Sequence, residues 1–326
     1  MFLTPIFDAM KKFAIVGGTE LAKVHAKNIQ RKGKLVAVCS TDEWGTEALG
    51  IEYSAKAYYS FDEMLATEKE IDIVVVCSAV GFHAEHIIKS LQAGKDVLCE
   101  SPLCLTKAAA WQIIETEKYC RRRVYLIQTP SFFSPFKRFG NDGWKKNIEK
   151  ARSFQVDCTM SLPIGFLSGI NGQKFPGGGL LYKPFGLVID LLLSLFGEIK
   201  TTEGFLTFPD DKTSDSVEDA GVAVIKMHSG VVGTFHWSTL TTNRRSLTII
   251  IGNNILEIDI EEPELLRMQA HRQYNIATIE GLMARLYKEV YDDLSKALRG
   301  KDINFPTAID GAKTVEAIEN IYKALR

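Results

Sequence analysis

The first half of the chain alternates between short apolar runs and segments with helical spacing. Its strongest run, at 71–77, reads IDIVVVC. Such runs of β-branched residues are typical of strands buried on both faces of a sheet. Strands that alternate with helices predict a doubly wound, parallel α/β domain. We place its strands at 12–17, 35–39, 71–77, 96–100 and 124–128, and helices at 19–32, 82–93 and 106–122.

The second half follows a different pattern, because strand-like runs succeed one another without helices between them. Ser229-Gly230 has the composition of a two-residue hairpin turn. We expect an α+β domain with an open, mostly antiparallel sheet of about six strands, and helices at 180–196, 277–298 and 307–325. The predicted domains are a Rossmann-type dinucleotide-binding domain at 1–130 and a substrate and oligomerisation domain at 131–326.

Charge and composition exclude several classes of function. The 326 residues include 39 basic and 40 acidic side chains, a balance that argues against a nucleic-acid or anionic-membrane surface. No apolar run approaches the length of a membrane span. The six cysteines form no CxxC pair and stand at no metal-ligand spacing, which favours a cytoplasmic protein without a metal site. Met1 and Met10 both remain candidate starts, since residues 1–10 lack the features of a signal peptide.

Three stretches carry a resemblance to a known family. His83-Ala84-Glu85 is followed by AGKDVLCE at 93–100 and by Pro102-Leu103. Gly177-Gly178-Gly179 precedes an apolar segment that ends in LFG, and the chain closes with LSKALRGKD and PTAIDGAKTVEAIENIY. In these motifs and in domain order the chain resembles the Gfo/Idh/MocA family of NAD(P)-dependent sugar and cyclitol oxidoreductases.

A dinucleotide site needs glycines after the first strand, and here only part of that pattern is present. Gly17 makes the tight turn, Thr19 replaces the glycine that approaches the pyrophosphate, and Glu20 places a negative charge in the first helical turn. Ser40 would not repel a 2′-phosphate, so NAD and NADP both remain candidates. The resemblance places the cofactor site at Gly17, Gly18, Thr19, Glu20, Ser40, Ser78, Val80, His83 and Glu100.

The catalytic positions that the resemblance implies are substituted. The lysine of the family's EKP motif is Ser101, and the positions of its Asp and His are Lys183 and Leu187. One hypothesis is a dehydrogenase acting on a sugar, cyclitol or related hydroxy compound, in which Lys183 supplies an ammonium group, Tyr182 is a second proton donor and Ser101 completes the site. The alternatives are an inactive pseudoenzyme that serves as a binding or scaffolding subunit, and a sensor of nucleotides or sugars.

The open sheet of the second domain also carries a prediction. An apolar sheet face seldom stays exposed to water. We therefore expect a homodimer or homotetramer.

Overall fold

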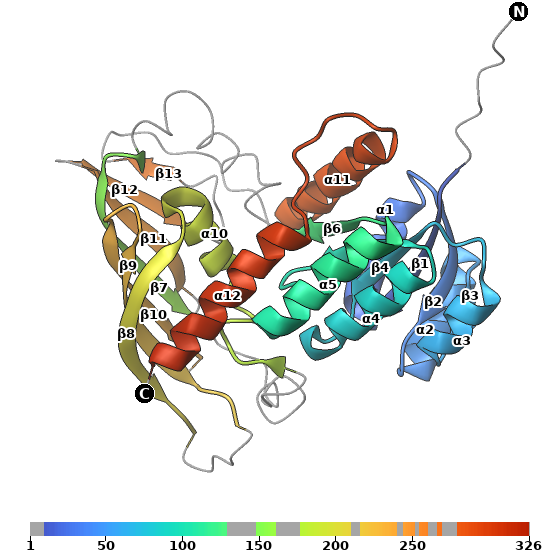
Figure 1. Ribbon diagram of the computed structural model, residues 1–326, viewed down its shortest axis with the longest axis horizontal. Coiled ribbons are helices and arrows are strands. Elements are labelled where there is room, and N and C mark those ends of the chain that lie inside the picture. Colours follow the sequence, from blue (N-terminus) through green and yellow to red (C-terminus); the bar gives the residue numbers. More distant parts are fainter. Residues whose placement is uncertain are drawn as a thin grey trace, which may run out of the picture.

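The computed structural model describes residues 10–128, 148–160, 177–209, 216–239, 244–251, 254–259, 266–268 and 279–325. For Thr19 and for residues 244–245, 251, 254–259, 266–268 and 279–284 it describes the backbone alone. Two sheets form two neighbouring lobes, and a long C-terminal helix lies across both (Figure 1).

The first lobe is the predicted doubly wound domain. Its six strands are all parallel and lie in the order β3-β2-β1-β4-β5-β6. They are β1 (Lys12–Gly17), β2 (Lys34–Cys39), β3 (Lys56–Tyr58), β4 (Ile73–Cys77), β5 (Asp96–Glu100) and β6 (Val124–Ile127). The short β3 was not predicted, because its three residues are too few to show a period.

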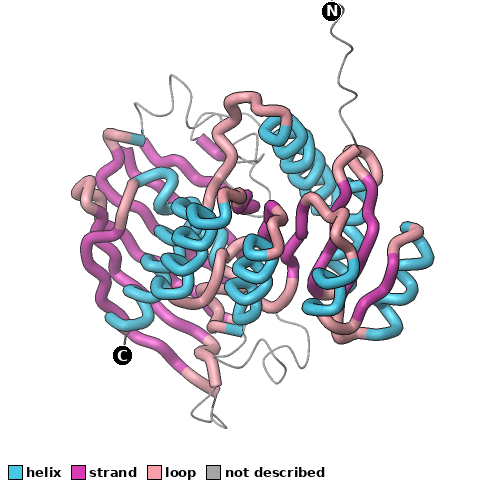
Figure 2. Tube along the Cα trace, turned by 45° about the vertical axis from the view of Figure 1, so that its right-hand side comes forward, coloured by secondary structure: helices cyan, strands magenta, loops and turns pink. Residues whose placement is uncertain are grey.

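Helices cover both faces of this sheet (Figure 2). One face packs against α1 (Thr19–Ile29), α2 (Glu43–Tyr53) and α11 (Ile279–Leu298). The other packs against α3 (Phe61–Thr67), α4 (Val80–Gln92), α5 (Lys107–Cys120) and the first half of α12 (Ala308–Ala324). α11 and the first half of α12 thus complete the core of the first lobe, although both were predicted within the second domain. The predicted boundary after residue 130 falls outside the described residues.

The second lobe is built on a sheet with the order β13-β12-β11-β7-β10-β9-β8. Its strands are β7 (Ala151–Thr159), β8 (Ile199–Thr207), β9 (Ala220–Met227), β10 (Val232–Ser238), β11 (Arg244–Ile251), β12 (Asn254–Asp259) and β13 (Leu266–Met268). The described pairs are antiparallel except β7 with β10, so the sheet is mixed. Phe154, Phe235 and Trp237 pack on α10 (Gly186–Phe196) and on the second half of α12.

The structure corrects the start of one predicted helix. We expected a helix from residue 180, but residues 180–185 form turns and α10 begins at Gly186. Pro184 explains the difference, because a proline disfavours helical backbone at the residue before it, here Lys183. Lys183 therefore lies on the turn that enters α10 instead of on the helix itself.

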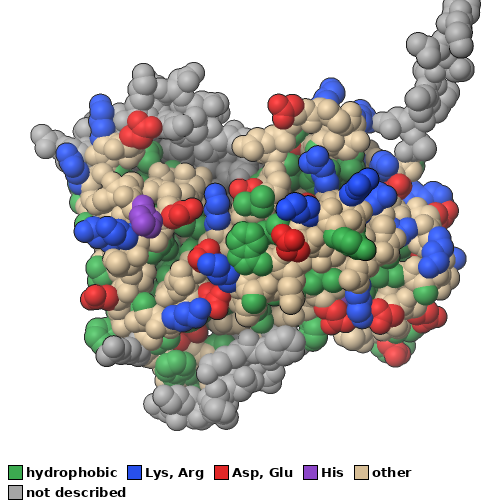
Figure 3. Space-filling view, in the orientation of Figure 1, with side chains coloured by type: hydrophobic (Ala, Val, Ile, Leu, Met, Phe, Trp, Pro, Cys, Tyr) green, Lys and Arg blue, Asp and Glu red, His purple; other side chains and the backbone are tan. Residues whose placement is uncertain are grey.

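The surface fits the charge balance of the sequence. On the face drawn in Figure 3, basic and acidic side chains occur over both lobes, and several acidic side chains lie close together at the lower right. None of the helices in the described part of the chain has the length and apolarity to cross a bilayer.

Candidate active site

The carboxyl ends of β1 and β4 define the floor of the candidate site. These strands are neighbours, and the connections that leave them run to opposite sides of the sheet, which is where doubly wound domains bind ligands. The two strand ends approach closely at Gly17, whose φ is 137°. A Cβ on Gly17 would lie 2.2 Å from the Cys77 carbonyl carbon and 2.3 Å from the Ser78 nitrogen. Only glycine fits there.

The two helices that start at this floor lack side-chain caps. The N-caps of α1 and α4 are Gly18 and Ala79, and neither makes a side-chain capping bond. By contrast, side chains cap α2, α3 and α5. Apart from the Phe82 N–H, which donates to the Ala79 carbonyl at 2.9 Å, the first-turn N–H groups of α1 and α4 therefore keep their capacity to bind an anion. Glu20 does not occupy this position, because it is exposed and pairs with Lys23 at 2.9 Å.

Other predicted cofactor residues lie around the same edge. Ser40 follows β2, accepts a hydrogen bond from the Asp42 nitrogen at 3.2 Å and lines one small cavity together with Gly17. Val80 begins α4 and is buried. The Ser78 hydroxyl lies 2.9 Å from Nδ1 of His86. Thr19 begins α1, but its side chain lies outside the described residues.

His83 connects two loops, and neither of its ring nitrogens is directed into the candidate site. Its ring nitrogens lie 2.8 Å from the backbone oxygens of Ser78 and Pro102, so the ring fixes the loop after β4 to the loop after β5. Burial, followed by the charge of Lys183, lowers the pKa of His83 to about 4. A neutral His83 ring has one N–H, so it donates a hydrogen bond to one of these two carbonyl oxygens and contacts the other.

Glu100 ends β5 and belongs to a buried polar network. Its Oε1 accepts a hydrogen bond from the Tyr287 hydroxyl at 2.6 Å and lies 2.9 Å from Nε2 of His25. The other His25 nitrogen lies 2.9 Å from the Tyr291 hydroxyl. Burial raises the pKa of Glu100, but His25, Tyr287 and the charge of Lys183 outweigh it and lower that pKa below its usual range. Glu100 is therefore an anion held by α1 and α11.

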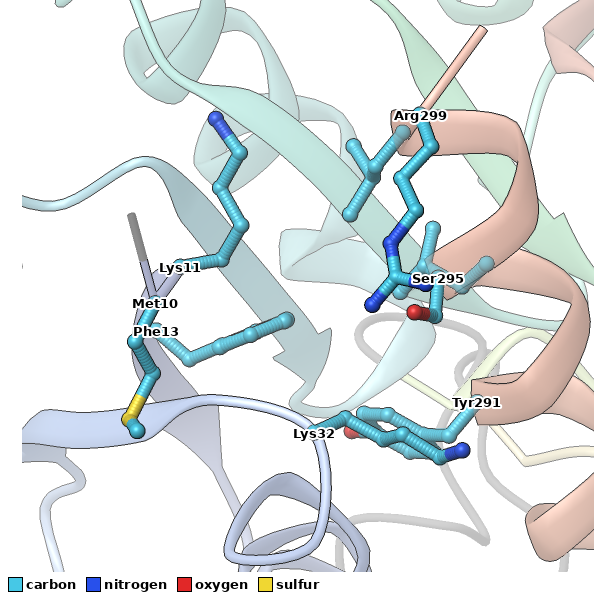
Figure 4. Close-up of a pocket in the computed structure, with 9 residues that line it drawn as sticks. Met10, Lys11, Phe13, Lys32, Tyr291, Ser295 and Arg299 are labelled. Carbon is cyan, nitrogen blue, oxygen red and sulfur yellow. The ribbon is translucent and has the colours of Figure 1, made fainter. Parts of the chain in front are cut away.

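Tyr291 also lines a cavity of about 60 Å³ at the other end of the sheet. Figure 4 shows that Tyr291, Ser295 and Arg299 enter it from α11 and the segment after it, and that Lys11 and Phe13 enter it from the start of β1. This cavity shares no lining residue with the predicted site. It lies apart from the candidate active site.

The turn before α10 brings Lys183 to the first lobe. Lys183 is half-buried, and its ammonium is close enough to lower the pKa of both His83 and Glu100. Tyr182 points elsewhere, because its hydroxyl donates to the Leu105 carbonyl at 2.5 Å and its ring stacks on Tyr322. The hydroxyl proton of Tyr182 is therefore committed to the backbone, and the proposed site does not include Tyr182.

A carboxylate network fixes this turn. The buried Glu218 accepts hydrogen bonds from the Leu180 nitrogen at 3.1 Å and from the Tyr322 hydroxyl. Tyr322 in turn accepts from the Leu181 nitrogen at 3.0 Å. Gly179 must be glycine, since a Cβ there would lie 2.4 Å from the Tyr322 hydroxyl oxygen. Glu218 and Tyr322 thus determine where the chain carries Lys183.

Comparison with known proteins identifies the family. A sequence model described as "Oxidoreductase family, NAD-binding Rossmann fold" matches residues 11–127, and the GFO/IDH/MocA C-terminal domain matches residues 148–255. The chain belongs to the Gfo/Idh/MocA family. D-glucoside 3-dehydrogenase of Escherichia coli is 32% identical over 110 residues, which are 33% of this chain and 31% of that protein. Inositol 2-dehydrogenase of Acidothermus cellulolyticus is 26% identical over 39% of this chain and 38% of its own length.

The chain therefore matches about a third of the length of these curated Gfo/Idh/MocA relatives. Solved structures match over nearly all of it. The WlbA dehydrogenase from Bordetella pertussis, solved with NADH and UDP-GlcNAcA, has a TM-score of 0.83 at 19% identity and covers 97% of this chain and 96% of its own. A levoglucosan dehydrogenase solved with NADH has a TM-score of 0.80 at 16% identity, over 96% of each chain. At these identities the likeness shows the shared fold.

The first domain is thus an NAD-binding Rossmann fold, and its residues fit the cofactor. Gly17 allows the close approach of the strands, and the uncapped starts of α1 and α4 offer free N–H groups to a pyrophosphate. NADP stays open beside NAD.

Sequence reasoning missed several groups that shape the site of this Gfo/Idh/MocA protein. His25 sits inside α1 with helical spacing, which is typical of a core position. Tyr287 contacts Glu100 from 187 residues away, and nothing local signals such a pair. Glu218 and Tyr322 are likewise 104 residues apart. Asp190 is an isolated acid in the sequence, and its partners become visible only in the structure.

Proposed function

We propose that this protein is an NAD(P)-dependent oxidoreductase that acts on a hydroxylated small molecule, such as a sugar or cyclitol, through an altered active site. One observation carries the proposal. Lys183, from the second lobe, brings an ammonium group to the carboxyl end of the parallel sheet, next to Glu100 and His83. A positive charge is thereby present at the cofactor edge although residue 101 is a serine.

The roles of the residues follow from their positions. Gly17, Gly18, Ser40, Ser78 and Val80 would surround the dinucleotide, whose nicotinamide accepts or gives a hydride when it is bound. Lys183 would stabilise negative charge that develops on the substrate oxygen, since a fixed ammonium in a partly dry site interacts strongly with an oxyanion. Ser101 would hydrogen-bond the same oxygen.

Turnover by purified protein tests this proposal. Wild type is assayed with NAD and NADP against a panel of sugars, cyclitols and nucleotide sugars, following absorbance of the reduced nicotinamide. Lys183→Met should lower kcat about 100-fold. Lys323→Met, at an exposed lysine on α12, is the matched control and should keep wild-type kcat.

Binding measurements separate the alternatives. A rise in melting temperature with NAD or NADP supports the oxidoreductase. A rise with a sugar alone would favour a sensor, and no rise with any compound would favour a scaffolding pseudoenzyme. Either of these two results, together with absent turnover, would overturn the proposal.

We also propose a homodimer or homotetramer assembled through the second sheet. Val222, Val224 and Val232 stand on its open face with exposures of 38%, 56% and 44%. Their neighbours Phe205 and Ile250 are exposed as well. Light scattering should give a multiple of the 36.4 kDa chain mass, and Val224→Lys should shift it towards the monomer. A monomeric wild type would contradict this proposal.

A cytoplasmic location is the third part of the proposal. All six cysteines are free, and five of them are buried. Free thiols in this number are typical of a reducing compartment. Fractionation of the source cells checks the location.

A further inference from the structure

Ser101 and Asp190 meet across the junction of the two lobes. Ser101 follows β5 in the first lobe, and Asp190 lies in α10 of the second. The Ser101 hydroxyl donates a hydrogen bond to Oδ2 of Asp190 at 3.1 Å. Ser101 occupies the position where the family resemblance places a lysine near the reacting groups. Its hydroxyl is thus joined directly to a carboxylate.

Two further side chains orient that carboxylate. Gln128, after β6, donates to Oδ1 of Asp190 at 3.0 Å, and Thr314, on α12, donates to the same oxygen at 2.5 Å. Both donors act on Oδ1, so Oδ2 is directed at Ser101. Asp190 itself is only 5% exposed. A nucleophile or acid that contacts a base, which a third group holds in turn, is the usual arrangement of a proton-transfer site.

We propose that Ser101 and Asp190 form a proton relay for the dehydrogenation. The inference rests on the proposed function and adds the route of the proton. As the substrate hydroxyl loses its proton to Oγ of Ser101, the Ser101 hydroxyl passes its own proton to Oδ2 of Asp190. The carbinol C–H and O–H bonds break, a carbonyl forms, and oxidised nicotinamide, the oxidant, takes the hydride. Asp190 touches no substrate and acts through Ser101.

The other polar groups of the site are occupied differently. Tyr182 donates to a backbone carbonyl, and both nitrogens of His83 face backbone carbonyls. Glu100 points to α1 and α11, where it meets Tyr287. Burial raises the pKa of Asp190 to about 6, although the bonds from Thr314, Ser101 and Gln128 oppose that shift. A base that titrates close to neutrality is suited to accept a proton.

A cavity gives the proton a way out. Asp190, Gln128 and Thr314 line a polar cavity of about 240 Å³, which is large enough for several water molecules. Besides Asp190, the charged groups that line it are Asp310 and Lys313 of α12, and neither Glu100 nor Lys183 is among its lining residues. A proton on Asp190 can therefore exchange with water without crossing the substrate site.

The test compares pH profiles of kcat for wild type and variants. Wild type should lose activity as the pH falls through about 6, because protonated Asp190 cannot accept a proton. Asp190→Asn and Ser101→Ala should lower kcat about 100-fold and abolish this acidic limb, with KM changed less than kcat. Asp190→Glu should recover part of the rate. Asp302→Asn, at an exposed acid ahead of α12, should keep the wild-type profile. An acidic limb that survives in Asp190→Asn or in Ser101→Ala would overturn the relay.

A second readout needs no turnover. Difference infrared spectra of the unliganded protein, with Asp190→Asn as the reference, report the protonation of the Asp190 carboxyl. A midpoint near 6 that moves upward in Ser101→Ala, which lacks one donor, supports the relay. A titration midpoint of about 4 for the Asp190 carboxyl, the ordinary value for aspartate, would overturn the relay. If wild type binds neither NAD nor NADP, the proposed function fails and the spectra still decide whether Asp190 can serve as the base.

Discussion

Glu100 and Ser101 are neighbours in the sequence, yet they belong to opposite kinds of polar network. Glu100 meets His25 and Tyr287 inside the first lobe. Ser101 meets Asp190 across the junction of the lobes. Two consecutive residues therefore belong to different networks. The Glu100 network lies inside the core of the first lobe, and the Ser101 network combines side chains from both lobes.

The difference lies in what each network can do. The Glu100 network is packed against the sheet by α1 and α11, and its carboxylate is stabilised as an anion. The Asp190 network borders a polar cavity, and burial raises the pKa of its carboxyl. We expect damage to the first network to cost mainly stability, and damage to the second to cost mainly activity.

The largest expected effect on stability is at Glu100. Glu100→Ala leaves the His25 ring and the Tyr287 hydroxyl buried without their carboxylate. Leaving these two buried polar groups without their acceptor should lower the free energy of unfolding by about 4 kcal/mol. Urea denaturation measures the loss. Glu100→Gln keeps an acceptor for Tyr287 and should lose roughly half as much, and equal losses would contradict the role of the Tyr287 bond.

Gly17 and Gly18 form a matched pair for the next test. Gly17→Ala forces a Cβ into the Cys77–Ser78 backbone at a positive φ and should cost about 3 kcal/mol and weaken NAD binding. Gly18 has a φ of −63°, and a Cβ added there would meet no atom within 4 Å, so Gly18→Ala should cost little. Thermal melts with and without NAD compare the two variants. Similar stabilities would refute the close approach of β1 and β4.

A substitution at Thr314 perturbs the Asp190 network less than a substitution of Asp190 itself. Thr314→Val removes one donor to Oδ1 of Asp190 with little change in volume. Stability should fall by about 1 kcal/mol. Because the Thr314 bond lowers the pKa of Asp190, its loss should move the acidic limb of kcat to higher pH. If the acidic limb of kcat stays at the same pH in Thr314→Val, Asp190 is not the group that causes it.

The smallest expected effect is at Glu20. This exposed carboxylate stands in the first turn of α1, where a negative charge opposes an incoming pyrophosphate. Glu20→Arg should tighten NAD binding about twofold at low salt, and added salt should reduce the gain. Isothermal titration calorimetry measures both. Weaker binding in Glu20→Arg would place the dinucleotide elsewhere.

Much of the fold could be predicted because its signals are local. Val74, Val75 and Val76 mark a doubly buried strand by themselves, and the glycine at residue 17 marks the turn that follows β1. The start of α10 was predicted too early, since the apolar run hid the effect of Pro184. The return of α11 to the first sheet was not predictable, because helical spacing shows which face is buried but not against what.

By itself, the sequence determined the doubly wound sheet, the glycine turn and the substitutions at Ser101, Lys183 and Leu187, because each is a property of consecutive residues. Only the tertiary structure decided which polar groups meet. Ser101 and Asp190 are 89 residues apart, and Glu100 and Tyr287 are 187 apart. Such pairs form because packed helices and sheets bring distant segments together. Burial then raises the pKa of Asp190, whereas His25, Tyr287 and the charge of Lys183 lower that of Glu100.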